Sequence, residues 1–254
     1  MSLIRKFDLT GRTAIVTGAS KGLGKSMAAA FLGQEANVVV SSRKQEACDE
    51  VATELRSMGG HATGIACHMG SSEQIERLVQ KTMETYGSID ILVNNAATNP
   101  VFGALEDAEE KIFDKIMAIN VKGPWELSKR ALPHLKENMG CIINISSIEG
   151  ITPGLGLGLY SVSKSSLIQL TKVMAREWGK MGVRANVICP GLVETKFSEA
   201  LTSNQNIMEY VMGRQALDML AKPDDVAGLA LFLASPASKF ITGGVYTADG
   251  GYTI

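Results

Sequence analysis

Short apolar runs rich in β-branched residues alternate along this chain with longer segments of helical length. A helix between successive strands allows those strands to run parallel, because a parallel pair needs a long crossover connection. Strands that are apolar throughout indicate a sheet that is buried on both faces. The expected strands are residues 13–17, 36–41, 61–67, 89–94, 141–146, 183–188 and 244–248. The expected helices are residues 23–35, 45–58, 72–86, 108–119, 124–138 and 159–181, with another opening at 222–226.

No linker, repeat or low-complexity tract interrupts this alternation. We therefore expect one α/β domain over residues 1–254, with about seven parallel strands and helices on both faces. Residues 192–220 are the exception, because they are too long for a simple connection between the sixth strand and the next helix. Their methionine, leucine and polar residues predict a lid over a functional site.

The overall charge and hydropathy exclude several classes of protein. A net charge of −1 provides no field that favours nucleic acid or an anionic membrane. No apolar run approaches the roughly 20 residues that a membrane-spanning helix needs. The first residues lack a secretory signal and the last three are not a peroxisomal signal, so we expect a cytoplasmic location.

The cysteines and histidines predict no disulfide and no metal site. Cys48, Cys67, Cys141 and Cys189 are widely spaced, and a chain with a large core does not need disulfides, so we expect reduced, buried thiols. The three histidines are isolated, and no group of residues has the spacing of metal ligands.

A glycine-rich turn, Thr17-Gly-Ala-Ser-Lys-Gly-Leu-Gly24, joins the first expected strand to the first helix. Glycines let the backbone approach a pyrophosphate, and the helix N-terminus supplies free N–H groups. The spacing G-x-x-x-G-x-G differs from the common G-x-G-x-x-G, and the turn lacks the ending of a P-loop, so a triphosphate site is disfavoured. The alternative is a turn that binds no ligand.

The end of the second strand favours NADP(H) over NAD(H). NAD binders place a carboxylate there for the ribose 2′-hydroxyl, whereas NADP binders place an arginine nearby for the 2′-phosphate. Here Ser42 is followed by Arg43 and Lys44, with no carboxylate before Glu46, and Lys21 offers a second positive charge. The alternative is that Arg43 and Lys44 only open a solvated helix.

Tyr160 and Lys164 lie four residues apart within an expected helix, so they share one face of it. An ammonium beside a phenol stabilises the phenolate, which predicts a lowered pKa for Tyr160 and a role in proton transfer. The spacing alone is more typical of a solvated surface pair.

Several motifs occur in one order along the chain: the glycine-rich turn, Asn94-Asn-Ala-Ala97, Asn120, Ile145-Ser-Ser147, Tyr160-x-x-x-Lys164, Pro190-Gly191 with Thr195, and Asp249-Gly-Gly251. In this order the chain resembles the classical short-chain dehydrogenase/reductases over nearly its whole length. The resemblance implies a single Rossmann-type doubly wound domain. It also implies a homotetramer in which residues 124–138 and 159–181 pack against other subunits.

The resemblance implies four catalytic residues. Tyr160 would be the acid/base, Lys164 would lower its pKa and bind the nicotinamide ribose, and Ser147 would bind the substrate carbonyl. Ser146 competes for that last role, but the family's serine precedes the tyrosine by thirteen positions, and 160 − 13 = 147 selects Ser147. Asn120 would steady a helix kink and a water in a proton relay through Lys164.

The resemblance also implies contacts with the dinucleotide along one edge of the sheet. Asn95, Ala96 and Ala97 would lie against the adenosine ribose, and Val193 and Thr195 would orient the carboxamide. His68 stands where the family often has an aspartate, so the adenine contact falls to a backbone N–H or to His68 itself. The expected cofactor-binding residues are Gly18, Ser20, Lys21, Gly22, Leu23, Gly24, Ser42, Arg43, His68, Met69, Asn95, Ala96, Ala97, Tyr160, Lys164, Pro190, Gly191, Val193 and Thr195.

The expected activity is hydride transfer between NADP(H) and a small carbonyl or secondary-alcohol substrate. A 3-oxoacyl-thioester reductase and a sugar or polyol dehydrogenase are alternatives, although the segments at Lys136 and Lys180 are only weakly basic for docking an acyl carrier protein. A non-catalytic NADP(H)-binding sensor module is the alternative from another class. Glu149 and Glu194 either meet a polar substrate or face water. The expected apolar wall, whose residues are equally typical of core or subunit contacts, is Leu155, Leu157, Met208, Val211, Met212 and Met219.

Overall fold

The computed structural model describes residues 3–254, which form a seven-stranded parallel sheet flanked by helices. The strand order is β3-β2-β1-β4-β5-β6-β7, and every neighbouring pair is parallel. This confirms the predicted Rossmann-type α/β fold. The strands are β1 Thr13–Thr17, β2 Asn37–Ser42, β3 Ala62–Ala66, β4 Ile91–Asn94, β5 Cys141–Ile145, β6 Arg184–Pro190 and β7 Val245–Ala248.

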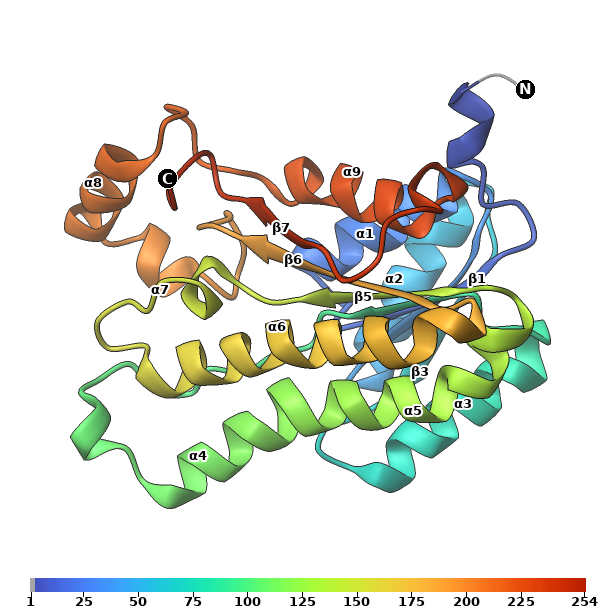
Figure 1. The fold of residues 1–254 in the computed structure, drawn as a ribbon, viewed down its shortest axis with the longest axis horizontal. Helices are drawn as coiled ribbons and strands as arrows, with labels where there is room; N and C mark the ends of the chain where they lie inside the picture. The colour runs from blue at the N-terminus through green and yellow to red at the C-terminus, as the bar shows by residue number, and fades with distance from the viewer. Residues whose placement is uncertain (1–2) are drawn as a thin grey trace.

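Helices cover both faces of the sheet (Figure 1). One face carries α1 (Gly22–Leu32), α2 (Gln45–Ser57) and α9 (Pro223–Ala234). The other face carries α3 (Ser72–Tyr86), α5 (Gly123–Glu137) and α6 (Gly158–Trp178).

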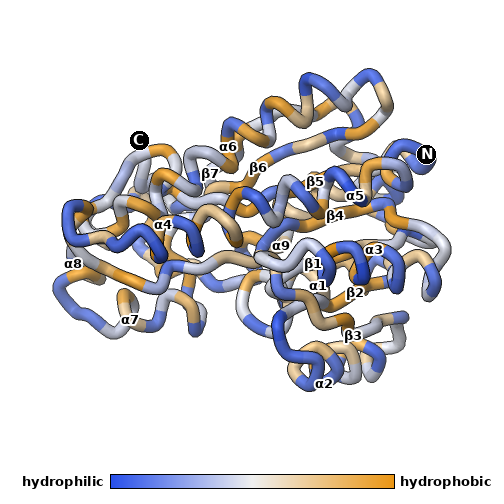
Figure 2. The backbone as a smooth tube through the Cα atoms, turned by 90° about the horizontal axis from the view of Figure 1, so that it is seen from below, coloured by the Kyte–Doolittle hydropathy of each residue, from blue (hydrophilic) through white to orange (hydrophobic). Residues whose placement is uncertain are grey.

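The alternation of side chains along each strand explains the two faces. Ala14 and Val16 join the core cluster that includes Phe31 of α1, whereas Ile15 between them joins the cluster that includes Leu127 of α5. Figure 2 shows the hydrophobic residues concentrated along the strands in the middle of the molecule. Burial on both faces is the reason that the strands are apolar throughout.

The two helices predicted at 108–119 and 124–138 form one helical path. It begins as α4 (Glu110–Met117), passes through a π-helical turn at Ala118–Lys122 and continues as α5. Pro124 has no N–H to donate to the carbonyl of Asn120, so the regular hydrogen bond is missing at this point. A π-turn accommodates that loss, and such turns are frequent at functional sites.

The remaining helices are short or lie at the predicted lid. In residues 192–220 the structure has α7 (Glu199–Thr202) and α8 (Gln205–Arg214), which lie at the end of the molecule where β6 and β7 finish (Figure 1). Single 3₁₀ turns occur at Leu3–Phe7, Leu105–Asp107, Ile148–Gly150, Gly179–Met181 and Pro236–Ser238. Among residues 3–254, no helix combines the length and the hydropathy needed to cross a bilayer.

Candidate active site

The end of β5 carries two neighbouring serines with different surroundings. Ser146 is buried, and its hydroxyl donates to the carbonyl oxygen of Lys164 at 2.8 Å. Ser147 is partly exposed, and its Oγ accepts a hydrogen bond from the backbone N–H of Glu149 at 3.1 Å. The structure therefore leaves the hydroxyl hydrogen of Ser147 free for a ligand, whereas Ser146 fastens β5 to α6.

Tyr160 lies in the first turn of α6 and is half-buried. Burial raises the pKa of its phenol, the Ser147 hydroxyl opposes that rise, and the carboxylate of Glu149 adds to it. The prediction that the pKa of Tyr160 is lowered by Lys164 is therefore wrong for this structure. Desolvation outweighs attraction here, because a phenolate that loses water without a close cation is unfavourable.

The position of the Lys164 ammonium explains why its charge does not offset the desolvation of the Tyr160 phenol. Its side chain is almost completely buried, and Nζ donates to the carbonyl oxygen of Ile145 at 2.8 Å. Nζ lies 5.5 Å from the centroid of the Tyr160 ring. Burial lowers the pKa of Lys164 to about 8.

Asn120 lies inside the π-helical turn and joins three elements. Its Oδ1 accepts from the N–H of Thr98 at 2.8 Å, and its Nδ2 donates to the carbonyl oxygen of Thr98 at 2.9 Å. Nδ2 also donates to Oγ of Ser163 at 3.0 Å, directly beside Lys164 in α6. The irregular turn thus aims a buried amide at the loop after β4 and at α6.

The glycine-rich turn after β1 packs against the turn after β4. Gly18 has φ of 65°, and a Cβ there would lie 2.8 Å from Nδ2 of Asn95. A Cβ on Gly24 would lie 2.6 Å from the same atom. Asn95 Nδ2 donates to the carbonyl oxygen of Thr17 at 2.8 Å. Only glycine fits these two positions, which lets the glycine-rich turn pack closely against the turn after β4.

The same turn meets the start of the lid. A Cβ on Gly22 would lie 3.2 Å from the Thr195 methyl group, and the Thr195 hydroxyl lies 3.0 Å from that of Ser198. Lys21 is exposed immediately before α1, while Ser20 and Leu23 are partly exposed. These predicted residues therefore share one edge of the sheet.

At the end of β2, one predicted side chain makes a contact within the chain and another is exposed without an ion-pair partner. Ser42 Oγ lies 3.3 Å from Sγ of Cys48, so its hydroxyl is engaged within the chain. Arg43 is exposed, and within residues 3–254 no carboxylate lies at ion-pair distance from it. Ser41 is buried and its hydroxyl has no hydrogen-bond partner among the described residues.

The predicted residues after β3 and β4 are fixed by hydrogen bonds between backbone and side chain and by packing in the core. Nδ1 of His68 accepts from the N–H of Gly70 at 3.1 Å, and the side chain of Met69 is buried in the core cluster that includes Ile119. Ala96 donates its N–H to Oγ1 of Thr17 at 3.1 Å. Ala97 is partly exposed at the same edge.

The segment after β6 is shaped by close backbone packing. A Cβ on Gly191, which follows Pro190, would lie 2.9 Å from Cα of Asp249. Val193 is buried and forms a β-bridge with Ala221 at the other end of the lid. The two ends of the lid are thus joined, and only the part between them is exposed.

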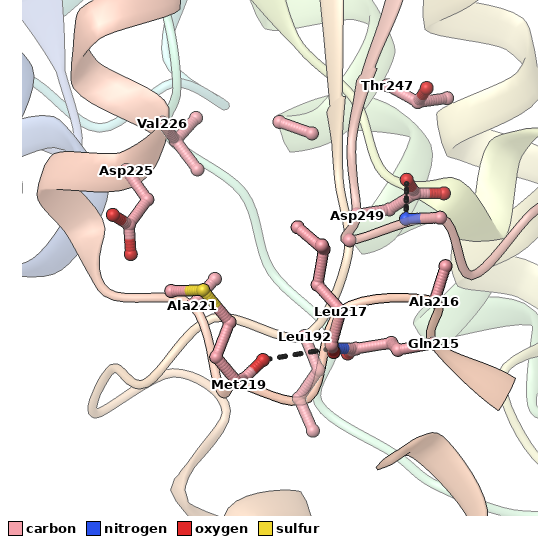
Figure 3. Close-up of a pocket in the computed structure, with 13 residues that line it drawn as sticks. Leu192, Gln215, Ala216, Leu217, Met219, Ala221, Asp225, Val226, Thr247 and Asp249 are labelled. Atoms are coloured by element: carbon pink, nitrogen blue, oxygen red, sulfur yellow. Dashed lines mark hydrogen bonds between the residues drawn. The ribbon is translucent and has the colours of Figure 1, made fainter. Parts of the chain in front are cut away.

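A cavity of about 510 Å³ lies where the lid closes against α9 and β7 (Figure 3). Leu192, Met219 and Val226 line it, whereas neither Ser147 nor Tyr160 does, although both lie in the described part of the chain. Of the expected apolar wall, Met219 therefore lines this cavity.

Phe197 is the aromatic residue that sequence reasoning missed. Its ring centroid lies 6.3 Å from that of Tyr160, and the side chain is 56% exposed. Phe102 lies against the loop before α6, since a Cβ on Gly156 would lie 2.7 Å from its ring. No spacing in the sequence brings Phe197 to Tyr160 or Phe102 to Gly156, because each comes from a different loop.

Ionisable clusters do not suggest another chemistry. Among residues 3–254, no three histidine, cysteine or acidic side chains are close enough to hold a metal ion. All four cysteines are buried and free. The edge instead combines a serine hydroxyl, a phenol and a buried amine with a glycine-rich turn, and the first three groups can donate protons and hydrogen bonds to a bound carbonyl oxygen.

Comparisons with known proteins agree with this arrangement. The family profile described as "Enoyl-(Acyl carrier protein) reductase" matches residues 18–253. The rabbit (Oryctolagus cuniculus) dehydrogenase/reductase SDR family member 4 is 39% identical over 97% of this chain and 95% of its own length. The tropinone reductase-like 3 of Erythroxylum coca is 38% identical over 97% of this chain and 94% of its own.

Solved structures agree as well. A gluconate 5-dehydrogenase from Burkholderia cenocepacia, in complex with NADP and tartrate, superposes with a TM-score of 0.95 at 28% identity, covering 99% of each chain. The sheet order, the helices on both faces and the sequence similarity lead to one conclusion. The chain belongs to the classical short-chain dehydrogenase/reductases and is an oxidoreductase of that family.

Proposed function

We propose that this protein transfers a hydride between NADP(H) and a small carbonyl or secondary-alcohol substrate, with Tyr160 as the acid/base. The arrangement of Ser147, Tyr160 and Lys164 at the carboxyl edge of the sheet carries the proposal. Two hydroxyl groups from different elements lie close together there, and a buried amine lies behind them.

NADPH would supply the hydride, and the chain's own residues would supply the proton and the orientation. In reduction, a raised pKa keeps the phenol of Tyr160 protonated, so it can donate its proton to the carbonyl oxygen. The Ser147 hydroxyl donates a hydrogen bond to the same oxygen as negative charge develops there. Asn120 holds α6 at Ser163, which fixes the neighbouring Lys164 behind the phenol.

The charges at the end of β2 support the proposed preference for NADP(H) over NAD(H). Arg43 and Lys44 are exposed there, and Lys21 is exposed at the neighbouring glycine-rich turn. A guanidinium binds a 2′-phosphate, whereas the carboxylate typical of NAD binders would repel it. The NADP complex of the Burkholderia relative supports the same choice.

For the substrate we propose an apolar ketone. The ring of Phe197 lies beside that of Tyr160, the ring of Phe102 lies against Gly156, and Leu155 in the same loop is 96% exposed. Apolar side chains of this kind favour substrates that bury carbon surface.

The decisive experiment is oxidation of NADPH and of NADH with aromatic and aliphatic ketones, 3-oxoacyl thioesters and sugar acids. We expect turnover of the apolar ketones with NADPH. Turnover of gluconate alone would favour the activity named for the Burkholderia relative, and turnover of thioesters would favour an acyl-carrier-protein reductase. Nucleotide binding without any turnover would favour a sensor module and contradict the proposal.

We also propose that the protein is a homotetramer and that it is cytoplasmic. Met117, Val121, Trp125 and Leu170 line a groove on the outer surface of α4, α5 and α6, and Trp125 is 41% exposed. Exposed apolar surface on packed helices is typical of subunit contacts. Light scattering with size-exclusion chromatography tests the assembly, and cell fractionation tests the location.

A further inference from the structure

Glu149 connects the turn that carries Ser147 with the helix that carries Tyr160. Its Oε2 accepts from the backbone N–H of Gly154 at 2.7 Å and from Oγ of Ser161 at 2.9 Å. Ser161 is buried and directly follows Tyr160. The carboxylate therefore fastens both the loop at Gly154 and the first turn of α6.

The backbone of the same residue acts on the serine. Its N–H donates to Oγ of Ser147 at 3.1 Å, which leaves the serine's own hydrogen free to turn toward a ligand. The turn lies against α6 so closely that a Cβ on Gly150 would be 2.7 Å from the carbonyl carbon of Lys164. One short turn thus contacts α6 at Ser161 and at Lys164.

We propose that Glu149 is a positioning residue, whose carboxylate holds the Ser147 turn and the Tyr160 helix in one fixed arrangement and holds a negative charge near the phenol. The charged groups that face Tyr160 are then Lys164 behind the ring and Glu149 on the adjoining turn. Because carboxylate and ammonium act on the phenol in opposite senses, Glu149 favours the protonated form, which is the form that reduction needs.

This inference rests on the proposed function for its kinetic tests but not for its structural one. Glu149→Gln keeps an oxygen acceptor and removes the charge, whereas Glu149→Ala removes both. Ser161→Ala removes one of the two hydrogen bonds and leaves the charge. Glu84→Gln, an exposed glutamate on α3, is the matched control for a change of one charge.

In Glu149→Ala we expect kcat for ketone reduction to fall about 10- to 100-fold, as loss of hydrogen bonds to a charged group suggests. The KM for NADPH should change by less than about twofold, because the glycine-rich turn is distant in the chain and makes none of these contacts. Ser161→Ala should show a smaller loss of kcat with an unchanged pH profile.

The pH profile separates charge from structure. In Glu149→Gln the pKa of Tyr160 should fall, so the rising limb of kcat for alcohol oxidation should move to lower pH while Glu84→Gln leaves it in place. An unmoved limb in Glu149→Gln would refute the proposed effect of the charge.

Hydrogen–deuterium exchange of residues 150–158 gives a readout that does not depend on activity. We expect faster exchange at Gly154 in Glu149→Ala and nearly wild-type exchange in Glu149→Gln and Glu84→Gln. Unchanged exchange in Glu149→Ala, together with kcat within about twofold of wild type, would overturn the proposal. If wild type turns over no ketone, the proposed function fails, while the exchange data still decide whether Glu149 holds this loop.

Discussion

The ends of β4 and β5 and the lid at 192–220 lie near the same site but are built in opposite ways. Under the site, Asn94 Nδ2 donates to Oδ1 of Asn144 at 2.8 Å, and Asn144 Nδ2 donates to Oγ1 of Thr171 at 2.8 Å. All three side chains are buried. In the lid, α7 and α8 bury no residue, and Asn204 caps α8 by accepting from the N–H of Ile207 at 3.2 Å.

We expect the buried network to position the site residues and the exposed lid to select the substrate. Oδ1 of Asn94 has no partner among the described residues, but the amide groups of Asn94 and Asn144 both donate hydrogen bonds, and these favour one arrangement beneath β5 that keeps Ser147 in register. The lid is anchored at its closing end, where the N–H groups of Ala216 and Leu217 both donate to the carbonyl oxygen of Gly250 at 2.9 Å. Between its anchors it has few buried contacts, so we expect it to open at little cost.

The largest effect is expected for Tyr160, which belongs to the rigid region of this comparison. Tyr160→Phe should reduce kcat for NADPH-dependent ketone reduction by about 10²- to 10⁴-fold, because it removes the proton donor. NADPH binding, measured by fluorescence titration, should be nearly unchanged. Tyr210→Phe, which removes a phenol from the lid, is the matched control and should retain most of kcat. Turnover within a few-fold of wild type in Tyr160→Phe would disprove the assigned role.

Lys164 predicts a pH dependence of stability. Its folded-state pKa of about 8 lies below its unfolded value of 10.5, so between these pH values the unfolded chain binds more protons and the folded state gains stability as pH rises. Relative to Lys164→Met, wild type should gain roughly 3 kcal/mol across that window.

Urea denaturation at pH 8, 9 and 10 measures this gain. The exposed Lys172→Met on α6 serves as the control and should show no pH-dependent difference from wild type. A constant difference between wild type and Lys164→Met would mean that the amine is not desolvated as the structure indicates.

A substitution at Arg43 tests whether positive charge at the end of β2 binds the 2′-phosphate of NADPH. Arg43→Ala should raise the KM for NADPH about 10- to 100-fold, since a guanidinium–phosphate hydrogen bond is charge-assisted, and should leave the KM for NADH unchanged. Arg56→Ala, on the last turn of α2, is the control. Equal changes for both cofactors would show that Arg43 does not contact the 2′-phosphate.

Two asparagines compare the network and the lid directly. Asn144→Ala removes one hydrogen bond from Asn94, which keeps its bond to Ser128, and one from Thr171, which keeps its bond to the carbonyl oxygen of Leu167. It should cost about 1–3 kcal/mol of unfolding free energy. Asn204→Ala removes only a helix cap and should cost about 0.5–1 kcal/mol. Chemical denaturation of both variants measures the loss of unfolding free energy. If the lid variant loses as much stability as Asn144→Ala, the two regions do not differ in the proposed way.

The smallest effect concerns the connection between α8 and the C-terminal segment. The Arg214 guanidinium lies 4.8 Å from the Tyr252 ring and donates to the Tyr210 hydroxyl at 2.9 Å. Arg214→Ala should raise the ketone KM about two- to fivefold with little change in kcat, as expected for an exposed cation–π contact. Limited proteolysis should cut residues 199–214 faster, and an unchanged rate would argue against this contact as a restraint on the lid.

Much of the architecture and the order of the site along the chain could be predicted from the sequence. Apolar runs and their spacing depend on local periodicity, which is why the parallel strands were found within a few residues. The π-turn at Asn120 was predicted only as a kink implied by family resemblance, although Pro124 is a local signal for it. The hydrogen bonds of the Asn120 side chain could not be predicted, because Thr98 and Ser163 are distant in sequence. The pKa shift of Tyr160 was predicted in the wrong direction, because desolvation of the phenol depends on what surrounds the ring.

By itself, the sequence determined the fold class, the family and the residues that stand at the carboxyl edge of the sheet, since hydropathy periods and glycine positions are local properties of a chain. Only the tertiary structure decided that the Ser146 hydroxyl fastens β5 to α6, that Lys164 turns toward Ile145, and that Glu149 joins two elements. Those outcomes depend on burial and on pairs of atoms brought together by packing, and neither is encoded in the spacing of residues along the chain.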